Sequence, residues 1–185
     1  MVNKTNSEDH DLLERARGGD EGAFSQLVRK HEPIVAATVI GMLGPGDDAE
    51  DVGQNVFIRF YNSLNNYRGD AALSTYLTRI AINLSLNELK RRKRRNLLFF
   101  VRRNEDQEYD LPDMKDNAAA FESKEVVNKA LQQLEPKFRS VVVLRMLQGY
   151  STDETAKILK LPVGTVLSRL SRAQDKLKEL LKNLI

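Results

Sequence analysis

Apolar residues recur along most of the chain at spacings of three and four, which is the period of an amphipathic α-helix. No segment alternates between apolar and polar positions for long enough to form a convincing strand. The pattern therefore predicts an all-α protein. The expected helices fall within residues 8–17, 20–43, 47–64, 71–95, 121–134, 136–147, 151–160 and 163–181.

Residues that start or stop helices stand between these segments. Asp20 is expected to cap the second helix, and Pro33 is expected to kink or divide it. Gly44-Pro-Gly46 is a firm break. After this break, Asp47 or Asp48 is expected to cap the third helix.

Charge is distributed unevenly and separates two halves of the chain. Residues 88–103 hold eight Lys or Arg and one acid, whereas residues 104–125 hold eight acids and two lysines. Within this stretch, Asn104–Asn117 contains Pro112 and lacks a helical stripe, so we predict a flexible linker there. The apolar run Leu97–Val101 is expected to continue the fourth helix or to dock on the second half, and peripheral membrane contact is the less favoured alternative.

This division predicts two small helical domains of four helices each, joined by the flexible acidic linker. Each domain is close to the lower size limit for independent folding. The expected bounds are 1–96 for the first domain, 97–120 for the linker and 121–185 for the second domain.

The amino-acid composition excludes several kinds of protein and site. The absence of cysteine excludes disulfides and thiolate zinc sites. The chain has no signal-peptide core and no apolar run of about 20 residues that could cross a bilayer. We therefore expect a cytoplasmic protein without a membrane span. His10 and His31 show no ligand spacing and are expected at the surface.

The segment from Gly149 to Leu181 is typical of a helix-turn-helix. Ser151-Thr-Asp-Glu154 is a capping box, and the short helix that it opens stops before Pro162. The second helix buries one apolar stripe and carries hydroxyl and cationic side chains on another face. Such side chains suit base edges and phosphates in a major groove. The candidate DNA-binding residues are Thr165, Ser168, Arg169, Arg172 and Lys176.

A second basic surface is expected at the end of the fourth helix. Residues 90–95 are six consecutive cations, and Arg79, Asn83 and Asn87 share one flank of the same helix. A cationic run alone is usually a solvated helix end. Combined with polar groups able to meet a base, it favours nucleic-acid binding.

The residues by themselves are also compatible with two other functional classes. The first is a free-standing dimeric helix-turn-helix regulator whose first domain dimerises and which binds a palindrome. The second is an enzyme with a Mg²⁺ site made by the carboxylates of Asp47, Asp48, Glu50 and Asp51. Acids are favoured at a helix start in any case, so this pattern is weak evidence for a metal.

Three motifs resemble one known family. Tyr67–Asn83 is similar to conserved region 2 of the small sigma factors of bacterial RNA polymerase, the extracytoplasmic-function group. Asp48–Asp51 with Gln54 and Phe57 resembles the preceding polymerase-binding helix. Leu134–Lys176 resembles region 4 of the same family, so the match spans about residues 11–181.

The resemblance implies a protein that binds core RNA polymerase and directs it to promoters, with no catalytic residues, metal or cofactor of its own. The second domain would read the −35 element with the five helix-turn-helix residues given above. The first domain would read and melt the −10 element, and the loop Arg68–Leu73 would shape a pocket for one flipped base near Asn83. The implied −10 residues are Arg68, Asp70, Arg79, Asn83, Asn87, Lys90 and Arg91.

The same resemblance implies the partners. Asp48, Asp51, Gln54 and Asn55 match the surface that meets the clamp helices of the largest polymerase subunit, and the flap is the other expected contact on the polymerase. No sensing domain is attached, so control by an anti-sigma protein is expected. The free protein is expected to be a monomer. Tyr76 stands where tryptophan is usual, an exchange expected to alter packing more than function.

Overall fold

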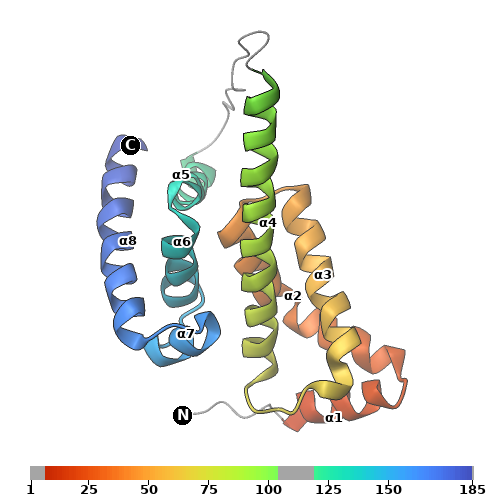
Figure 1. Ribbon diagram of the computed structural model, residues 1–185. Helices are drawn as coiled ribbons and strands as arrows, with labels where there is room; N and C mark the ends of the chain where they lie inside the picture. The colour runs from red at the N-terminus through yellow and green to blue at the C-terminus, as the bar shows by residue number, and fades with distance from the viewer. Residues whose placement is uncertain (1–6, 104–118, 185) are drawn as a thin grey trace.

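The computed structural model describes residues 7–103 and 119–184, and within these ranges it contains helices and connecting turns but no strand. The predicted all-α fold is confirmed. In Figure 1 the long helix α4 stands in front of α2, with α1 and α3 on one side and α5–α8 on the other, and α2 also contacts α5 and α6. The helices are α1 Ser7–Arg17, α2 Glu21–Leu43, α3 Asp47–Ser63, α4 Leu73–Arg103, α5 Ala119–Gln133, α6 Pro136–Val142, α7 Thr152–Leu159 and α8 Val163–Leu184, with a 3₁₀ turn at Leu64–Asn66 and a π-helical turn at Val143–Leu147.

The start of α2 follows its sequence signals, and of the two outcomes expected at Pro33 a division of the helix is absent. The Asp20 carboxylate accepts a hydrogen bond from the Ala23 amide at 3.0 Å, which confirms the predicted cap. Pro33 does not divide the helix, which runs unbroken from Glu21 to Leu43. Pro33 is exposed, so water can satisfy the carbonyl group that the missing N–H leaves without a donor.

The start of α3 differs from the prediction. Gly46, with φ of 131°, occupies the N-cap position, and no side chain caps the helix. Asp47 and Asp48 lie in the first turn instead. Their carboxylates remain favourable there because the first turn carries the positive end of the helix dipole.

The core of the first domain is built where α2, α3 and α4 meet. Phe60 of α3 lies at its centre, and the ring contacts Phe24, Tyr67 and Tyr76 at centroid distances of 5.9, 6.4 and 6.2 Å. Helix α4 packs against α2 and α3 in this domain and also contacts α6 and α7. The largest fully buried side chains of this domain include Leu13, Leu27, Met42, Leu73, Leu77 and Ile82.

His31 is not a surface residue, in contrast to the prediction. Its side chain is buried, with 6% of the residue exposed, and Nε2 lies 3.3 Å from Oδ2 of buried Asp9. Burial lowers the pKa of His31, and the neighbouring Asp9 carboxylate opposes that shift. His31 lies one turn from Leu27 and one turn from Val35, on the buried face of α2. His10 is exposed as expected.

The second domain packs α8 along α6 and α5. One cluster joins Phe138, Val142 and Ala173, and a neighbouring cluster joins Val141 and Val166 to α7. The predicted capping box at the start of α7 is present. The Glu154 amide donates to Ser151 Oγ at 3.2 Å, and the Ser151 amide donates to the Glu154 carboxylate at 2.8 Å.

The expected linker is shorter at its first end than residues 97–120. Residues 97–103 form the last turns of α4, so Leu97–Val101 continues the fourth helix, the first of its two expected outcomes. Residues 104–118, which hold most of the acidic run, lie outside the described residues.

The two domains are packed on each other. The first core extends to Val143, Leu144, Tyr150 and Ile158 of the second half. None of the helices in the described ranges combines the length and apolar character that a membrane crossing requires.

Candidate nucleic-acid and polymerase interfaces

The face of α8 predicted to bind DNA is turned outward. Val166 and Ala173 are fully buried on the opposite side, which fixes the orientation of the helix. Ser168 and Arg172 are exposed, and Thr165 and Arg169 are half-buried beside them. These four side chains therefore share one accessible helix face.

Lys176 differs from the other four predicted −35 residues. Its ammonium group lies 3.1 Å from Glu135 Oε1 and 4.8 Å from the centre of the Phe138 ring. These contacts tie the far end of α8 to the start of α6. Lys176 therefore contributes to packing within the domain, in addition to its positive charge.

The turn between α7 and α8 sets the direction of α8, the predicted recognition helix. Lys160 ends α7 in the left-handed conformation, with φ of 53°, and the Leu161 amide donates to the Ala156 carbonyl at 2.9 Å. A left-handed non-glycine residue costs about 1–2 kcal/mol. The buried contacts of α7 and α8 with α6 offset that cost.

Asn83 borders a cavity of about 400 Å³ on the surface of the first domain. Its side chain is exposed on the flank of α4. The expected loop Arg68–Leu73 does not line this cavity. The wall comes from α3 and the first turns of α4, and its other residues are Arg59, Asn62, Ser63, Tyr76 and Ile80.

Tyr76 is positioned at this cavity by a hydrogen bond. Its hydroxyl lies 3.1 Å from Ser63 Oγ, which also bonds to the backbone of α3. Tyr76 thus has a polar contact that tryptophan would not make in the same way. The sequence reasoning missed Arg59 and Asn62, although both lie on the exposed side of the amphipathic pattern of α3.

Asp70 and Arg79 lie at a different cavity of about 440 Å³, between the start of α4 and α7. Glu154 and Lys157 of the second domain form its other side. Arg68 is exposed on the loop before α4. The predicted −10 residues therefore do not form one continuous pocket.

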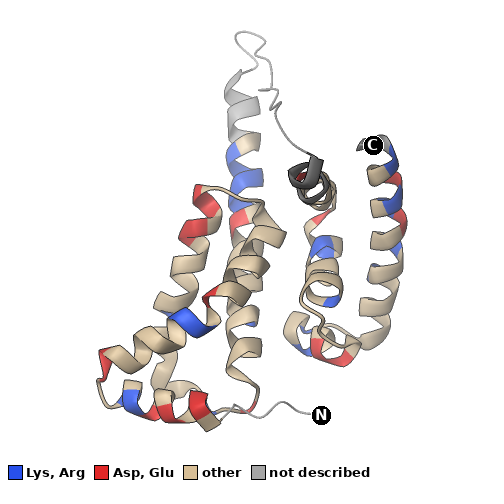
Figure 2. Cartoon of the chain, turned by 180° about the vertical axis from the view of Figure 1, so that it is seen from behind, with Lys and Arg blue, Asp and Glu red and all other residues tan. Residues whose placement is uncertain are grey.

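The remaining predicted −10 residues lie farther along α4, where Figure 2 shows a band of Lys and Arg. Asn87 and Lys90 are exposed. Arg91 is exposed and pairs with Glu88, with 2.7 Å between Nε and Oε2, and this pairing raises the pKa of Arg91. The band thus includes both free and paired cations.

The predicted polymerase-binding residues divide into two groups. Asp51, Gln54 and Asn55 are exposed on α3. Asp48 is half-buried, and its Oδ2 accepts from Arg92 Nε at 2.8 Å. Asp48 therefore holds the Arg92 side chain in place, in the basic part of α4.

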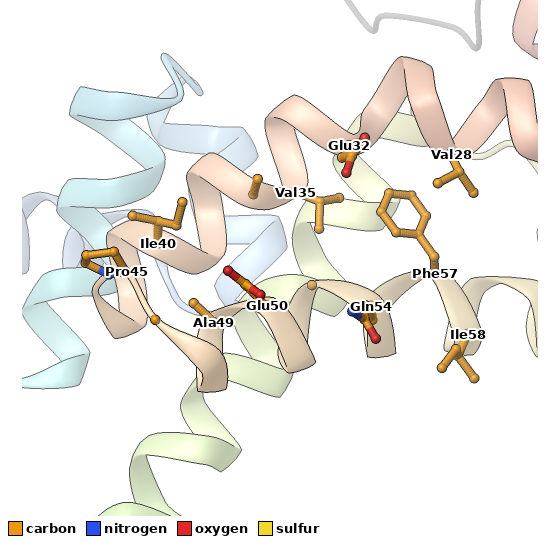
Figure 3. Close-up of a pocket in the computed structure, with 13 residues that line it drawn as sticks. Val28, Glu32, Val35, Ile40, Pro45, Ala49, Glu50, Gln54, Phe57 and Ile58 are labelled. Carbon is orange, nitrogen blue, oxygen red and sulfur yellow. The ribbon is translucent and has the colours of Figure 1, made fainter.

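Beside the exposed group runs a groove of about 720 Å³ between α2 and α3. Figure 3 shows Phe57 reaching from α3 towards α2, with Gln54 and Ile58 along the α3 side. Ile58 is 55% exposed, so an apolar side chain faces solvent on the same helix as the exposed polar side chains of Gln54 and Asn55. Tyr61 is 57% exposed, and its ring and that of Phe24 meet edge to face.

The carboxylates considered as a metal site are not gathered into one. Asp47, Glu50 and Asp51 are exposed, whereas Asp48 is paired with Arg92. Among residues 7–103 and 119–184, no three His, Asp or Glu side chains are arranged to hold a metal ion.

Comparison with known proteins matches both domains to one family. The family models Sigma-70 region 2 and Sigma-70 region 4 match residues 27–95 and 124–177. The RNA polymerase sigma-H factor of Pseudomonas aeruginosa is 34% identical over 98% of this chain and 97% of its own length. The ECF RNA polymerase sigma-E factor of Escherichia coli K12 is 33% identical over 96% of both chains.

A solved structure supports the same assignment. CnrH, in complex with the cytosolic domain of CnrY, superposes with a TM-score of 0.67 and 28% identity over 95% of this chain and 98% of that one. The sigma factor RpoE of Bartonella quintana, in complex with the anti-sigma factor NepR, shares the fold at 24% identity and a TM-score of 0.67, over 86% of this chain and 96% of that one. The chain belongs to the sigma-70 family of RNA polymerase sigma factors, in the extracytoplasmic-function group.

Proposed function

We propose that this sigma factor binds core RNA polymerase through the outer face of α3 and reads promoter DNA with α4 and α8. The observation that carries the proposal is the outward face of α8, where Ser168 and Arg172 are exposed on a helix fixed by buried residues. A rigid helix with short donors and a guanidinium on one face suits the major groove.

The α3 face supplies the polymerase contact in this proposal. Asp51, Gln54 and Asn55 present polar groups next to the apolar Ile58 and the groove between α2 and α3. An apolar centre beside polar groups is the usual composition of a protein interface. The clamp helices of the largest subunit are the proposed partner, and the second domain contacts the flap.

The cavity at Asn83 is the proposed site for one flipped −10 base. The amides of Asn83 and Asn62 offer donors and acceptors, and Tyr76 supplies an aromatic ring at the same cavity. Extruded bases are read by hydrogen bonds to the Watson–Crick edge and by stacking on aromatic side chains. Arg59 adds a cation suited to a neighbouring phosphate.

We infer that the chain supplies recognition and leaves catalysis to the polymerase, without a cofactor or metal of its own. It acts as a monomer when free and works in the cytoplasm, where its polymerase partner is. CnrH and the Bartonella RpoE are both seen with partner proteins, and the RpoE partner is an anti-sigma factor. We propose that an anti-sigma factor also controls this chain.

Run-off transcription with core polymerase, followed by mapping of the start sites, tests the proposed function. The purified chain is expected to shift with core on a sizing column and to produce transcripts from a shared −35 and −10 pattern. The dimeric-regulator alternative predicts a dimer that binds a palindrome and leaves core polymerase unbound. That outcome would refute the proposal.

Arg172→Ala is expected to weaken recognition of the −35 element by about 1–3 kcal/mol if the guanidinium reads a base. A phosphate contact would instead lower affinity equally on all sequences and reduce its salt dependence. Promoter binding by holoenzyme should be measured on several −35 variants at several salt concentrations. Lys178→Ala, exposed on another face of α8, is the control. Equal binding by wild type and Arg172→Ala in every condition would exclude both roles.

Asn83→Ala is expected to lower promoter opening and to relax base preference at one −10 position. Core binding and −35 contact should stay intact, because the Asn83 side chain is exposed and α8 is distant in sequence. Permanganate footprinting on a set of −10 variants measures the effect. Gln26→Ala, exposed on α2, is the control. Unchanged opening with unchanged base preference would remove Asn83 from the site.

A further inference from the structure

Two large apolar side chains are exposed at the start of α8. Val163 is 41% exposed and Leu167 is 52% exposed, so both side chains face solvent. Val166, which lies between them in the sequence, is fully buried, and Leu170 packs against the cluster that contains Val166. Val163 and Leu167 therefore lie outside this core and are accessible to a partner.

The two exposed side chains form one patch. Residues four positions apart lie on the same side of a helix, with about 5–6 Å between their Cβ atoms. Gly164, next to Val163, adds no side chain, and a Cβ atom placed there would meet no described atom within 4 Å. The surface around the pair is therefore open. We call Val163 and Leu167 the apolar patch of α8.

The apolar patch adjoins the polar face that is proposed to read the −35 element. At about 100° per residue, Leu167 and Arg172 stand about 140° apart around the helix. Two short side chains, Ser168 and Ser171, lie between them, and all four residues are exposed. The middle of this face is therefore shallow, with a long alkyl group on one side and a guanidinium on the other. Such a helix can lie close to the base edges of a major groove, which is wide enough to admit it.

Ser168 presents a hydrogen-bond acceptor on this face. Its hydroxyl donates to the Thr165 carbonyl at 3.1 Å, so its single hydrogen is used within the helix. The oxygen keeps lone pairs for a base amino group, which adenine and cytosine present in the major groove. The guanidinium of Arg172 can only donate. The exposed face thus combines an apolar group, an acceptor and a donor, the three kinds of contact that distinguish base pairs in the major groove.

The partner group that suits the apolar patch is the methyl group of thymine. This methyl is the apolar group that distinguishes one base from the others in the major groove, where the remaining recognition atoms are nitrogen and oxygen. An exposed leucine or valine gains free energy by covering the methyl, because both apolar surfaces then leave water. The same side chain placed against a base amide or a carbonyl would remove water from a polar group without replacing its hydrogen bond.

The charge around the patch favours DNA over a protein partner. The first twelve residues of α8 hold Arg169 and Arg172 and no acid, and Lys160, just before the helix, is exposed. The acids of α8, Asp175 and Glu179, lie at least two turns beyond Leu167. The phosphates on either side of a major groove complement this cationic surround.

We propose that the apolar patch of α8 covers thymine methyl groups in the −35 element and makes those positions specific for thymine. This inference rests on the proposed function and adds a base identity to it. Four residues rise by about 6 Å along a helix, and base pairs are about 3.4 Å apart, so the patch spans two neighbouring base pairs. Leu167 is the more exposed of the two residues and makes the larger contact.

Replacement of thymidine by deoxyuridine tests the contact directly, because it removes only the methyl group. A −35 element is taken from the promoters that run-off mapping identifies, and each of its thymines is replaced in turn on either strand. Binding of each DNA by the full chain with core polymerase is then measured. The wild type is expected to lose affinity about fourfold at one or two positions, the factor that corresponds to burial of one methyl group. Deoxyuridine at the other positions should have no effect.

Substitutions in the patch should remove this discrimination. Leu167→Ala is expected to bind the thymine promoter more weakly and to bind thymine and uracil equally at one of the sensitive positions. Leu167→Met keeps an apolar side chain of similar volume and should retain the difference. Val127→Ala is the matched control, because Val127 is 42% exposed on α5 and lies outside the proposed DNA surface. It should bind every DNA as the wild type does.

Three results would overturn the proposal. The first is equal affinity of the wild type for thymine and uracil at every −35 position. The second is a thymine preference that both Leu167→Ala and Val163→Ala retain. The third is an equal loss by Leu167→Ala on thymine and uracil DNA, which would assign the patch to a protein partner.

Failure of the proposed function has a different signature. In that case the wild type with core polymerase would bind promoter and unrelated DNA alike, and Arg172→Ala would match it in every condition. The thymine contact would then fall together with −35 recognition. If only the thymine contact is wrong, promoter binding and the effect of Arg172→Ala remain.

Discussion

Arg139→Met is expected to lower the free energy of unfolding by about 3 kcal/mol. Methionine nearly preserves the volume but removes every donor from a buried site. The carbonyls of Met42 and Leu134 would be left without their partner inside the protein. A buried acceptor without a donor costs about 1–3 kcal/mol, and the expected loss of free energy of unfolding is the combined cost of these two carbonyls. Urea unfolding followed by far-ultraviolet circular dichroism measures it.

Lys137→Met is the matched control for this measurement. Lys137 lies two residues away on the same helix, is exposed, and pairs with exposed Glu135 at 2.7 Å. Exposed pairs of this kind contribute little to stability, so the control should unfold close to the wild type. A loss below about 1 kcal/mol for Arg139→Met would show that water replaces the guanidinium at these carbonyls.

Phe60→Ala is expected to destabilise the chain by about 3–5 kcal/mol, the usual cost of truncating a buried phenylalanine. Phe60 is 1% exposed, and its ring contacts those of Phe24, Tyr67 and Tyr76. The cavity left behind would also loosen Tyr76, so promoter opening should fall together with stability. Thermal and urea unfolding, together with permanganate footprinting, measure the two effects.

Ile58→Ala on the same helix is the control for stability. Its side chain is 55% exposed, so the change should stay within about 0.5 kcal/mol. If Phe60→Ala and Ile58→Ala unfolded at the same urea concentration, the aromatic cluster would not be the centre of the first core.

The helices could be predicted because their signals are local. A capping box such as Ser151–Glu154 satisfies backbone groups within one turn, so it works in any tertiary setting. The same holds for Asp20 at the start of α2. The N-cap of α3 was mispredicted because Gly46 adopts a backbone conformation that residue preferences at Asp47 and Asp48 do not reveal.

The candidate DNA surfaces were only partly predictable. The outward face of α8 follows from one periodic stripe, because burying Val166 and Ala173 turns the opposite side to solvent. Arg79 and Arg91 lie on the same helix, α4, yet twelve residues at 1.5 Å each separate them by about 18 Å. Their neighbours therefore differ, and α3 and α7 decide which residues line each cavity.

The helical class, most helix boundaries and the polar face of α8 follow from the amino-acid sequence, because periodicity and capping depend on residues a few positions apart. The burial of His31, the hydrogen bond from Arg92 to Asp48 and the packing of the two domains on each other instead depend on contacts between distant parts of the chain. Arg139 meets the Met42 carbonyl across 97 positions of sequence. Neither residue carries a local signal for the other, because a helix end accepts any donor that the fold brings to it.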